Sequence, residues 1–286
     1  AVQVIQDRVA EQRTLETMLA VLLIGGLVVV LVAFGFGAVY ARRALVPIRE
    51  SLTTQRASLR RQREFAADAS HELRTPLTVI RSSVDYLRRH GSEPVEVVGT
   101  ALEDIDEEVG HMTSIVEDLL LLARSDSGAV ELEHVPVDLG DVAADGASAL
   151  GKPATDRGVR VEVDPQPAVV SGDPARLRQL VMILVDNAIR HSPTDGRVAV
   201  EVRSDPAGAS LTVEDDGPGI RPEDLPHLFE RFYRANGAPG GGTGLGLAIA
   251  AWIVDRHGGR IEVANRDEGG ARFVVHLPIA TTSGAG

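Results

Sequence analysis

The sequence lacks cysteine altogether. This absence excludes disulfide bonds, thiolate catalysis and metal sites with cysteine ligands, and it leaves the redox compartment undetermined. Any bound metal ion must therefore be held by oxygen or imidazole ligands.

The sequence also lacks an excess of basic residues. Its 29 Lys and Arg residues are outnumbered by 41 Asp and Glu residues, so the formal net charge is −12 and the isoelectric point is about 5.1. A protein that binds a polyanion needs a basic patch, and the sequence shows none, so we expect no nucleic-acid partner. With 286 residues and 44% hydrophobic content, the chain is long enough for roughly two domains with stable cores.

A third absence is that of charge between Thr17 and Ala41, a stretch dense in Leu, Val, Ile, Ala and Gly. A helix needs ~20 apolar residues to cross a bilayer, so this stretch predicts a transmembrane helix. A signal peptide is the alternative, but it would have a shorter apolar run and a cleavage site. Arg42 and Arg43 follow, and the positive-inside rule then places the rest of the chain in the cytoplasm. Because the first residue is Ala1 rather than Met, we expect further chain upstream, such as a sensor region.

Apolar residues next recur at alternating spacings of four and three, which is typical of helices that pack in bundles. The first series comprises Leu73, Leu77, Ile80, Val84 and Leu87. The second follows a break at Gly91, Ser92 and Pro94 and comprises Val95, Val98, Leu102, Ile105, Val109, Met112, Val116 and Leu119. We expect a hairpin of two amphipathic helices. Since one hairpin does not readily bury both apolar seams, we expect two chains to pair as a homodimer with a four-helix bundle.

The pattern changes after Gly128 to short β-like runs interleaved with helical stretches. We expect strands at Val159–Val163, Val198–Val202, Leu211–Val213, Arg260–Val263 and Arg272–Leu277. We expect helices at Pro174–His191 and Thr243–His257. This order predicts an α+β sandwich in which helices cover one sheet.

The first helical series contains the segment Ala69-Ser70-His71-Glu72-Leu73-Arg74-Thr75-Pro76-Leu77. If Leu73 and Leu77 face the seam, His71 faces solvent, and Thr75 lies four residues on along the same face. An exposed imidazole is partly neutral at pH 7 and is then a competent nucleophile toward a phosphoryl group. The alternative is a solvated surface histidine. A zinc-protease motif is excluded because its second histidine would have to stand at Thr75.

This segment resembles the H-box of histidine kinases residue for residue. The resemblance implies that His71 is the phospho-acceptor and that Glu72 is the general base that holds the imidazole in its reactive tautomer. It also implies that Thr75 positions the water that removes the phosphoryl group from a partner protein. The alternative for Glu72 is an exposed charge on a helix surface.

The segment Leu184–His191 resembles the N-box of the same family, and by this resemblance Asn187 binds Mg²⁺ through its side-chain oxygen. The family has a second asparagine one turn earlier, where this chain has Ile183. Ile183 either lines the edge of the site or points into the core, and the apolar stripe that it forms with Leu180, Leu184 and Ala188 favours the core. An asparagine on a helix is otherwise usually a surface residue.

Three further segments resemble the G1, F and G2 boxes of that family. Asp215-Asp216-Gly217-Pro218-Gly219 resembles the G1 box, which implies that Asp215 accepts a hydrogen bond from the adenine amine while Gly217 and Gly219 let the backbone approach the base. A hairpin turn is the alternative for this segment. The F-box resemblance implies that Phe229 and Phe232 pack against the nucleotide lid, whereas plain core packing is their alternative.

The segment Gly240–Leu247 resembles the G2 box. Glycines in this loop would form the lid, and backbone amides at a helix N-terminus would bind phosphate, unless the loop is a simple linker. The resemblance therefore implies ATP contacts from Gly242, Thr243, Gly244, Leu245, Gly246 and Leu247.

With these boxes, the chain resembles the sensor histidine kinases of two-component systems from about Arg42 to Pro278. The resemblance implies an ATP- and Mg²⁺-dependent autokinase in the bacterial inner or plasma membrane. Such an enzyme passes its phosphoryl group to an aspartate of a response regulator and also acts as a phosphatase on that regulator. It implies a transmembrane helix, a dimeric four-helix bundle and an α+β sandwich ATP-binding domain of the Bergerat type. Two alternatives are a signalling scaffold that lost turnover, suggested by Ile183, and an ATPase clamp like the mismatch-repair and chaperone relatives, which would not need the H-box.

The expected domain boundaries follow from these segments. They are an extracytoplasmic segment at 1–16, a transmembrane helix at 17–41, a helical linker at 42–64, a dimerisation and phosphotransfer domain at 65–126, a catalytic ATP-binding domain at 135–280, and a flexible tail at 281–286.

Overall fold

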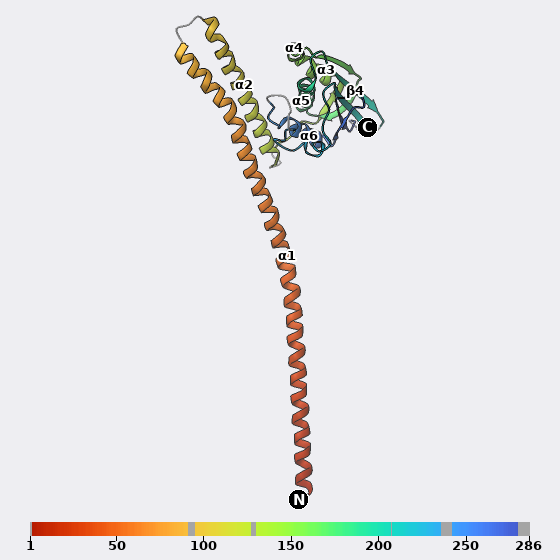
Figure 1. The fold of residues 1–286 in the computed structure, drawn as a ribbon. Helices are drawn as coiled ribbons and strands as arrows, with labels where there is room; N and C mark the ends of the chain where they lie inside the picture. The colour runs from red at the N-terminus through yellow and green to blue at the C-terminus, as the bar shows by residue number, and fades with distance from the viewer. Residues whose placement is uncertain (1, 91–94, 127–129, 207, 236–241, 280–286) are drawn as a thin grey trace. The chain divides into compact units, whose positions relative to one another are not determined.

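The computed structural model describes residues 2–90, 95–126, 130–206, 208–235 and 242–279. Two long helices come first in the chain, and an α+β domain follows them (Figure 1). The chain groups into two units, residues 1–66 and 67–286. The predicted order of an apolar helix, a helical hairpin and an α+β domain is confirmed.

Helix α1 runs without interruption over Val2–His90. Its stretch Arg13–Tyr40 is long and apolar enough to cross a membrane, and it covers nearly all of the predicted span 17–41. Large apolar side chains are exposed along this stretch, and Phe34 is 79% exposed. Exposed apolar surface in water costs about 25 cal/mol per Å², so these side chains suit a lipid environment.

The later part of α1 and α2 (Val95–Asp126) form the predicted hairpin. The predicted break at Gly91, Ser92 and Pro94 lies outside the described residues. Along both helices the apolar series alternates between two degrees of burial. The partly buried members are Leu73, Ile80, Leu87, Val98, Ile105, Met112 and Leu119. The exposed members recur every seven residues, are 40% to 56% exposed, and are Leu77, Val84, Leu102, Val109 and Val116.

The main sheet has five strands in the order β2-β4-β5-β7-β6. The strands are β2 at Arg160–Pro165, β4 at Arg197–Asp205, β5 at Gly208–Asp215, β6 at Arg260–Asn265 and β7 at Ala271–Leu277. Strand β2 pairs in parallel with β4, and the other neighbours are antiparallel. Because side chains alternate along a strand, every second residue of β5 from Ala209 to Asp215 is buried.

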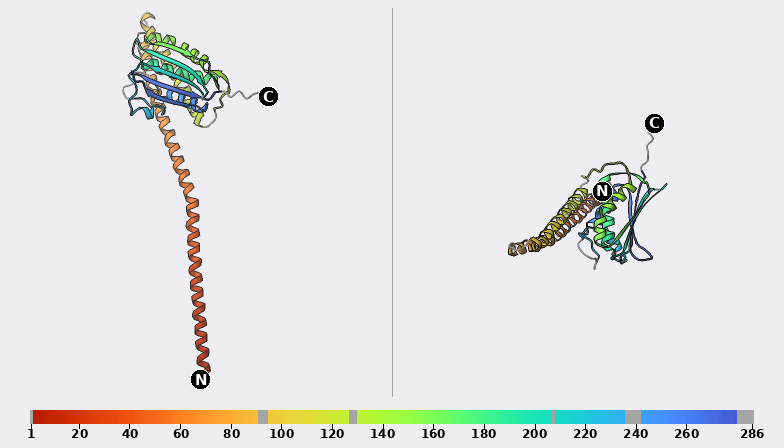
Figure 2. Two further views of the ribbon diagram at one scale, coloured as in Figure 1. Left: turned by 90° about the vertical axis from the view of Figure 1, so that its right-hand side faces the viewer. Right: turned by 90° about the horizontal axis from the view of Figure 1, so that it is seen from above.

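Helices pack on one face of this sheet, as the view from above in Figure 2 shows. They are α3 at Leu139–Ala149, α5 at Pro174–His191 and α6 at Gly246–Arg256. The core lies between this helical layer and the sheet, and Leu180, Ile253 and Phe273 are among its fully buried side chains. The predicted α+β sandwich is therefore confirmed.

Helix α5 has the predicted bounds because its first residues cap it well. The Asp173 carboxylate accepts hydrogen bonds from the backbone N–H groups of Ala175 and Arg176, and Pro174 takes the first helical position.

Helix α6 begins three residues later than the predicted Thr243. Gly244 adopts a φ of +68°, which a right-handed helix cannot contain, and the Thr243 hydroxyl accepts a hydrogen bond from the Leu245 N–H just before the helix. The prediction was wrong here because the spacing of apolar residues does not reveal a left-handed glycine.

Helix α3 was not predicted, and neither were several short elements. Strands β1 (Val135–Asp138) and β3 (Val169–Gly172) form a separate antiparallel pair, and α4 (Gly151–Asp156) and the 3₁₀ turn at Leu225–His227 are single short turns. Such elements are too short to show a hydrophobic period.

Candidate active site

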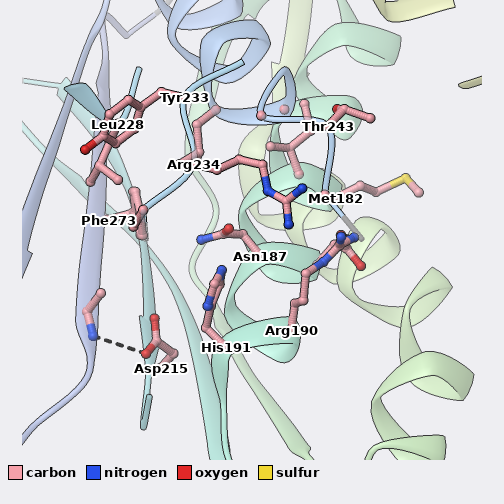
Figure 3. Close-up of a pocket in the computed structure, with 18 of the residues that line it drawn as sticks. Met182, Asn187, Arg190, His191, Asp215, Leu228, Tyr233, Arg234, Thr243 and Phe273 are labelled. Atoms are coloured by element: carbon pink, nitrogen blue, oxygen red, sulfur yellow. Dashed lines mark hydrogen bonds and ion pairs between the residues drawn. The ribbon is translucent and has the colours of Figure 1, made fainter. Parts of the chain in front are cut away.

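A cavity of about 820 Å³ lies beside the C-terminal half of α5 and the N-terminus of α6. Figure 3 shows the side chains of Asn187 and His191 from α5 in its middle, with Asp215 toward one end and Thr243 toward the opposite end. A cavity of this size is typical of sites for nucleotide-sized ligands.

Helix α5 brings three polar side chains to the cavity from its last turn. Arg190 and His191 follow Asn187 by three and four residues, so all three lie on one helix face. Arg190 pairs with Asp186 at 2.6 Å. The prediction missed Arg190 and His191, although their spacing from Asn187 was a sufficient signal.

Burial lowers the pKa of His191 below its usual value, and the positive charge of Arg190 lowers it further, whereas Asp215 acts in the opposite sense. A neutral imidazole at pH 7 offers one donor and one acceptor, and it adds no positive charge to the cavity wall.

Asp215 is the last residue of β5 and is only 3% exposed. Its Oδ1 accepts hydrogen bonds from the backbone N–H groups of Gly217, at 2.8 Å, and Ala271, at 3.1 Å. Burial raises the pKa of this carboxyl, while these two hydrogen bonds, His191 when it is protonated, and the charge of Arg266 lower it. Both fixed bonds engage one oxygen, so the second oxygen is the one that can accept from a ligand.

The glycines of this turn permit close backbone packing. A Cβ added at Gly217 would lie 2.7 Å from Oδ1 of Asp215 and 2.8 Å from the carbonyl oxygen of His191. Gly219 has a φ of +75° and lines the cavity, whereas Gly217 supports it from behind.

The loop before α6 closes the other end of the cavity. Gly242, Thr243, Gly244, Gly246 and Leu247 line it, and residues 236–241 lie outside the described residues. The first amides of a helix have no partner within the helix, so this end presents donors suited to phosphate. Leu245 does not line the cavity, because its side chain is fully buried in the core.

The two predicted phenylalanines do not line the cavity either. Phe229 and Phe232 are partly buried and pack against the core. Phe232 has a φ of +61°, and its N–H donates to the Gly244 carbonyl at 2.9 Å, so it supports the loop before α6. The neighbouring Tyr233 lines the cavity and donates to the buried Asp224 at 2.6 Å.

The histidine of the hairpin has the predicted exposure. His71 and Thr75 are exposed, four residues apart on α1, and Glu72 is half-buried between them in sequence. The short side chain of Thr75 therefore lies one turn from the imidazole on the same helix face.

The comparison with known proteins identifies both parts of the chain. Residues 61–128 match the family described as the His Kinase A (phospho-acceptor) domain, and residues 172–281 match the histidine kinase-, DNA gyrase B- and HSP90-like ATPases. The sensor histidine kinase TrcS of Mycobacterium tuberculosis is 40% identical over 237 residues, which cover 78% of this chain and 46% of TrcS. The chain belongs to the sensor histidine kinases.

Other sensor histidine kinases agree with this assignment. The signal transduction histidine-protein kinase/phosphatase MprB of Mycobacterium avium is 39% identical over 236 residues, covering 77% of this chain and 44% of MprB. The solved structure of the Acinetobacter baumannii histidine kinase AdeS is 27% identical with a TM-score of 0.61, covering 73% of this chain and 98% of that structure. The chain spans about half the length of the curated relatives it matches.

As a histidine kinase, the chain departs from the expected N-box at Ile183. This side chain is partly buried, packs against the core and also lines the cavity. Ile183 therefore both lines the edge of the site and contacts the core, the two environments that the sequence left open. It also lies close to the start of α6, because a Cβ added at Gly246 would lie only 3.4 Å from its Cγ2.

The amide of Asn187 is suited to hold Mg²⁺ in this kinase. It faces the cavity, and it makes no hydrogen bond to other residues within the described ranges. Among those residues there is also no group of three His, Asp or Glu side chains that could hold a metal ion. Mg²⁺ binds with few protein ligands and keeps several waters, so one amide oxygen beside nucleotide phosphates fits its needs.

Proposed function

We propose that this chain is an ATP-dependent autokinase that phosphorylates His71 and transfers the phosphoryl group to an aspartate of a response regulator. The observation that carries the proposal is the arrangement of the cavity, which has a buried carboxylate at one end and helix N-terminal amides at the other. The same chain carries an exposed histidine within a phospho-acceptor domain.

The cavity favours one orientation of ATP. The free oxygen of Asp215 accepts from the adenine amine, and the amides before α6 take the phosphates, since they carry the positive end of the helix dipole. Arg190 lies near this loop, because a Cβ added at Gly242 would lie 3.2 Å from its Nη1. Its guanidinium can therefore bind a phosphate oxygen.

In the transfer step, a ring nitrogen of His71 forms a bond to the γ-phosphorus while the bond from that phosphorus to the β–γ bridging oxygen breaks, so ADP leaves. Glu72 accepts the proton of the other ring nitrogen, which keeps the attacking nitrogen neutral. Asn187 would hold Mg²⁺, which would supply charge neutralisation on the phosphates. The rest of the catalysis is positioning.

We propose that the active form is a homodimer. The apolar side chains at Leu77, Val84, Leu102, Val109 and Val116 are exposed and recur every seven residues, whereas the alternate heptad positions are partly buried. A second hairpin packed on this series would bury it, giving a four-helix bundle.

We also propose that residues 17–41 anchor the chain in the bacterial inner or plasma membrane. The length and composition of the Arg13–Tyr40 stretch support this assignment. By the positive-inside rule, Arg42 and Arg43 support a cytoplasmic location for the catalytic part.

Incubation of the full chain with γ-labelled ATP and Mg²⁺ tests the proposal. We expect acid-labile, base-stable label on the chain, followed by transfer to a purified response regulator of the source organism. ATP binding without label would favour a signalling scaffold. ATP hydrolysis without label would favour an ATPase clamp.

The phosphatase role of Thr75 has a separate test. We expect Thr75→Ala to lower the dephosphorylation rate of a phosphorylated regulator by about tenfold or more, since the positioned water is lost, while autophosphorylation changes by less than about twofold. Thr78→Ala is the matched control, because this exposed hydroxyl lies on the same helix and, among the residues that the structure describes, bonds only the Arg74 carbonyl. Equal losses in both reactions would instead give Thr75 a packing role.

A further inference from the structure

The turn that carries Asp215 is held by a hairpin that lies outside all five sequence boxes. This hairpin joins β6 to β7 and comprises residues 265–271, about 50 residues after the turn. It contacts the turn near both ends, through Arg266 at the Asp215 end and Asn265 at the Ile220 end.

Arg266 fixes the first end of the turn. Its Nη1 donates to the backbone carbonyl of Asp215 at 2.7 Å and to the carboxylate of Asp216 at 2.8 Å. The Arg266 side chain is only 16% exposed, whereas the Asp216 side chain is 41% exposed, so the charge-assisted bond to the Asp215 carbonyl is the better shielded of the two.

Asn265 fixes the second end with two bonds. Its Oδ1 accepts from the Ile220 N–H and its Nδ2 donates to the Ile220 carbonyl, both at 2.7 Å. A side-chain amide that pairs with both backbone groups of one residue holds that residue's position and orientation.

The hairpin backbone completes the support. The Ala271 N–H donates to Oδ1 of Asp215, and this bond is drawn as the dashed line in Figure 3. Gly270 has a φ of +88°, and a Cβ there would overlap the Asp215 carbonyl. The hairpin thus contacts Asp215 through the Arg266 side chain, the Ala271 amide and Gly270, which packs directly against the Asp215 carbonyl.

These contacts bear on which base the cavity accepts. An ionised carboxylate accepts a hydrogen bond from the adenine amine but repels the carbonyl oxygen that guanine carries at the same ring position. This discrimination requires that the Asp215 carboxylate keep its place to a fraction of an ångström.

We propose that Arg266 and Asn265 are positioning residues that set the adenine selectivity of this kinase by fixing the turn from Asp215 to Ile220. The proposal rests on the proposed role of Asp215 as the adenine acceptor. Neither residue touches the nucleotide in this scheme, because both act through the turn.

The test uses the full chain in detergent and measures calorimetric Kd values for Mg-ATP and Mg-GTP, together with the KM and kcat of autophosphorylation. We expect Arg266→Met to raise the Kd and KM for ATP by about tenfold and to lower the preference for ATP over GTP by a similar factor, with kcat at saturating ATP changed by less than about threefold. Arg266→Lys should recover part of the preference, since an ammonium can reach one of the two acceptors.

Arg272→Met is the matched control. Arg272 lies in the same sheet and pairs with Glu214, but it makes no bond to Asp215 or Asp216 within the described residues. We expect this variant to keep its nucleotide preference. If Arg266→Met matches Arg272→Met in KM and in nucleotide preference, the proposal is overturned.

Two further measurements keep the outcome clear. If Arg266→Met does not fold, the preference of Arg266→Lys decides, and an unchanged preference overturns the proposal. Asp215→Ala is measured in parallel. If Asp215→Ala keeps the preference for ATP, the adenine assignment itself fails, whereas loss of preference in Asp215→Ala but not in the Arg266 variants overturns the positioning inference alone.

Discussion

His71→Gln is expected to lower autophosphorylation by about 10³-fold or more while leaving ATP binding unchanged. Glutamine keeps a polar side chain of similar length on an exposed helix position, but its amide nitrogen is not a nucleophile toward phosphorus. The helix should remain intact, since the side chain is exposed. Acid-labile label from γ-labelled ATP measures the first effect, and calorimetric Mg-ATP binding measures the second.

His90→Gln is the matched control for this experiment. His90 is a second histidine of α1, but its ring stacks on Tyr86 and its Nδ1 lies 3.0 Å from the Tyr86 carbonyl oxygen. This variant should keep its label. Label at the wild-type level in His71→Gln would reject His71 as the phospho-acceptor, and lost ATP binding in the same variant would mean that the change disturbs folding.

Asn187→Ala is expected to lower ATP-dependent phosphorylation by about 10²-fold, and Asn187→Asp should also remove most of it. Alanine removes the amide that the last turns of α5 present to the cavity, whereas Gln179 presents its amide two turns earlier. Aspartate restores an oxygen but adds a negative charge beside the phosphates. Titration of Mg²⁺ at fixed ATP should show a higher half-saturating concentration for Asn187→Ala, and normal autophosphorylation of this variant would overturn the metal assignment.

Ile183→Asn provides the complementary change on the same helix. Ile183 lines the cavity four residues before Asn187, on the same helix face. An asparagine there can add a second oxygen near the metal, and we expect it to tighten Mg-ATP binding roughly threefold. Because the side chain also contacts the core, the melting temperature must be measured with the binding. A loss of about 1–3 kcal/mol of stability without tighter binding would show that the core contacts dominate.

The long amphipathic elements were predictable because burial leaves a period in the sequence. The heptads predicted the hairpin, and the helix predicted at Pro174–His191, with its apolar stripe of Leu180, Ile183, Leu184 and Ala188, has the same bounds as α5. In contrast, β1 and β3 are four residues each and exist through pairing with each other, which no local period reveals.

The residues of the candidate site were likewise predictable only in part. Asn187 and Asp215 were found from their motifs, whereas Arg190 and His191 in the same N-box segment were missed. The sequence also could not separate Leu245, Phe229 and Phe232, which pack in the core, from neighbours that line the cavity. The support from Arg266 was not predictable, because it depends on a contact 51 residues away in the chain. Contacts between distant segments follow from the order of the strands and leave no spacing in the sequence.

Because of the exposed apolar series on the hairpin, the stability of the proposed bundle should depend on the protein concentration. When folding of one hairpin is completed by a second chain, the apparent melting temperature depends on protein concentration, since association shifts the equilibrium by mass action. Diluting the detergent-solubilised protein would then unfold the bundle at a temperature at which the concentrated protein is stable. A bilayer has the opposite effect, because chains anchored in one surface meet at a much higher local concentration than the same chains free in solution.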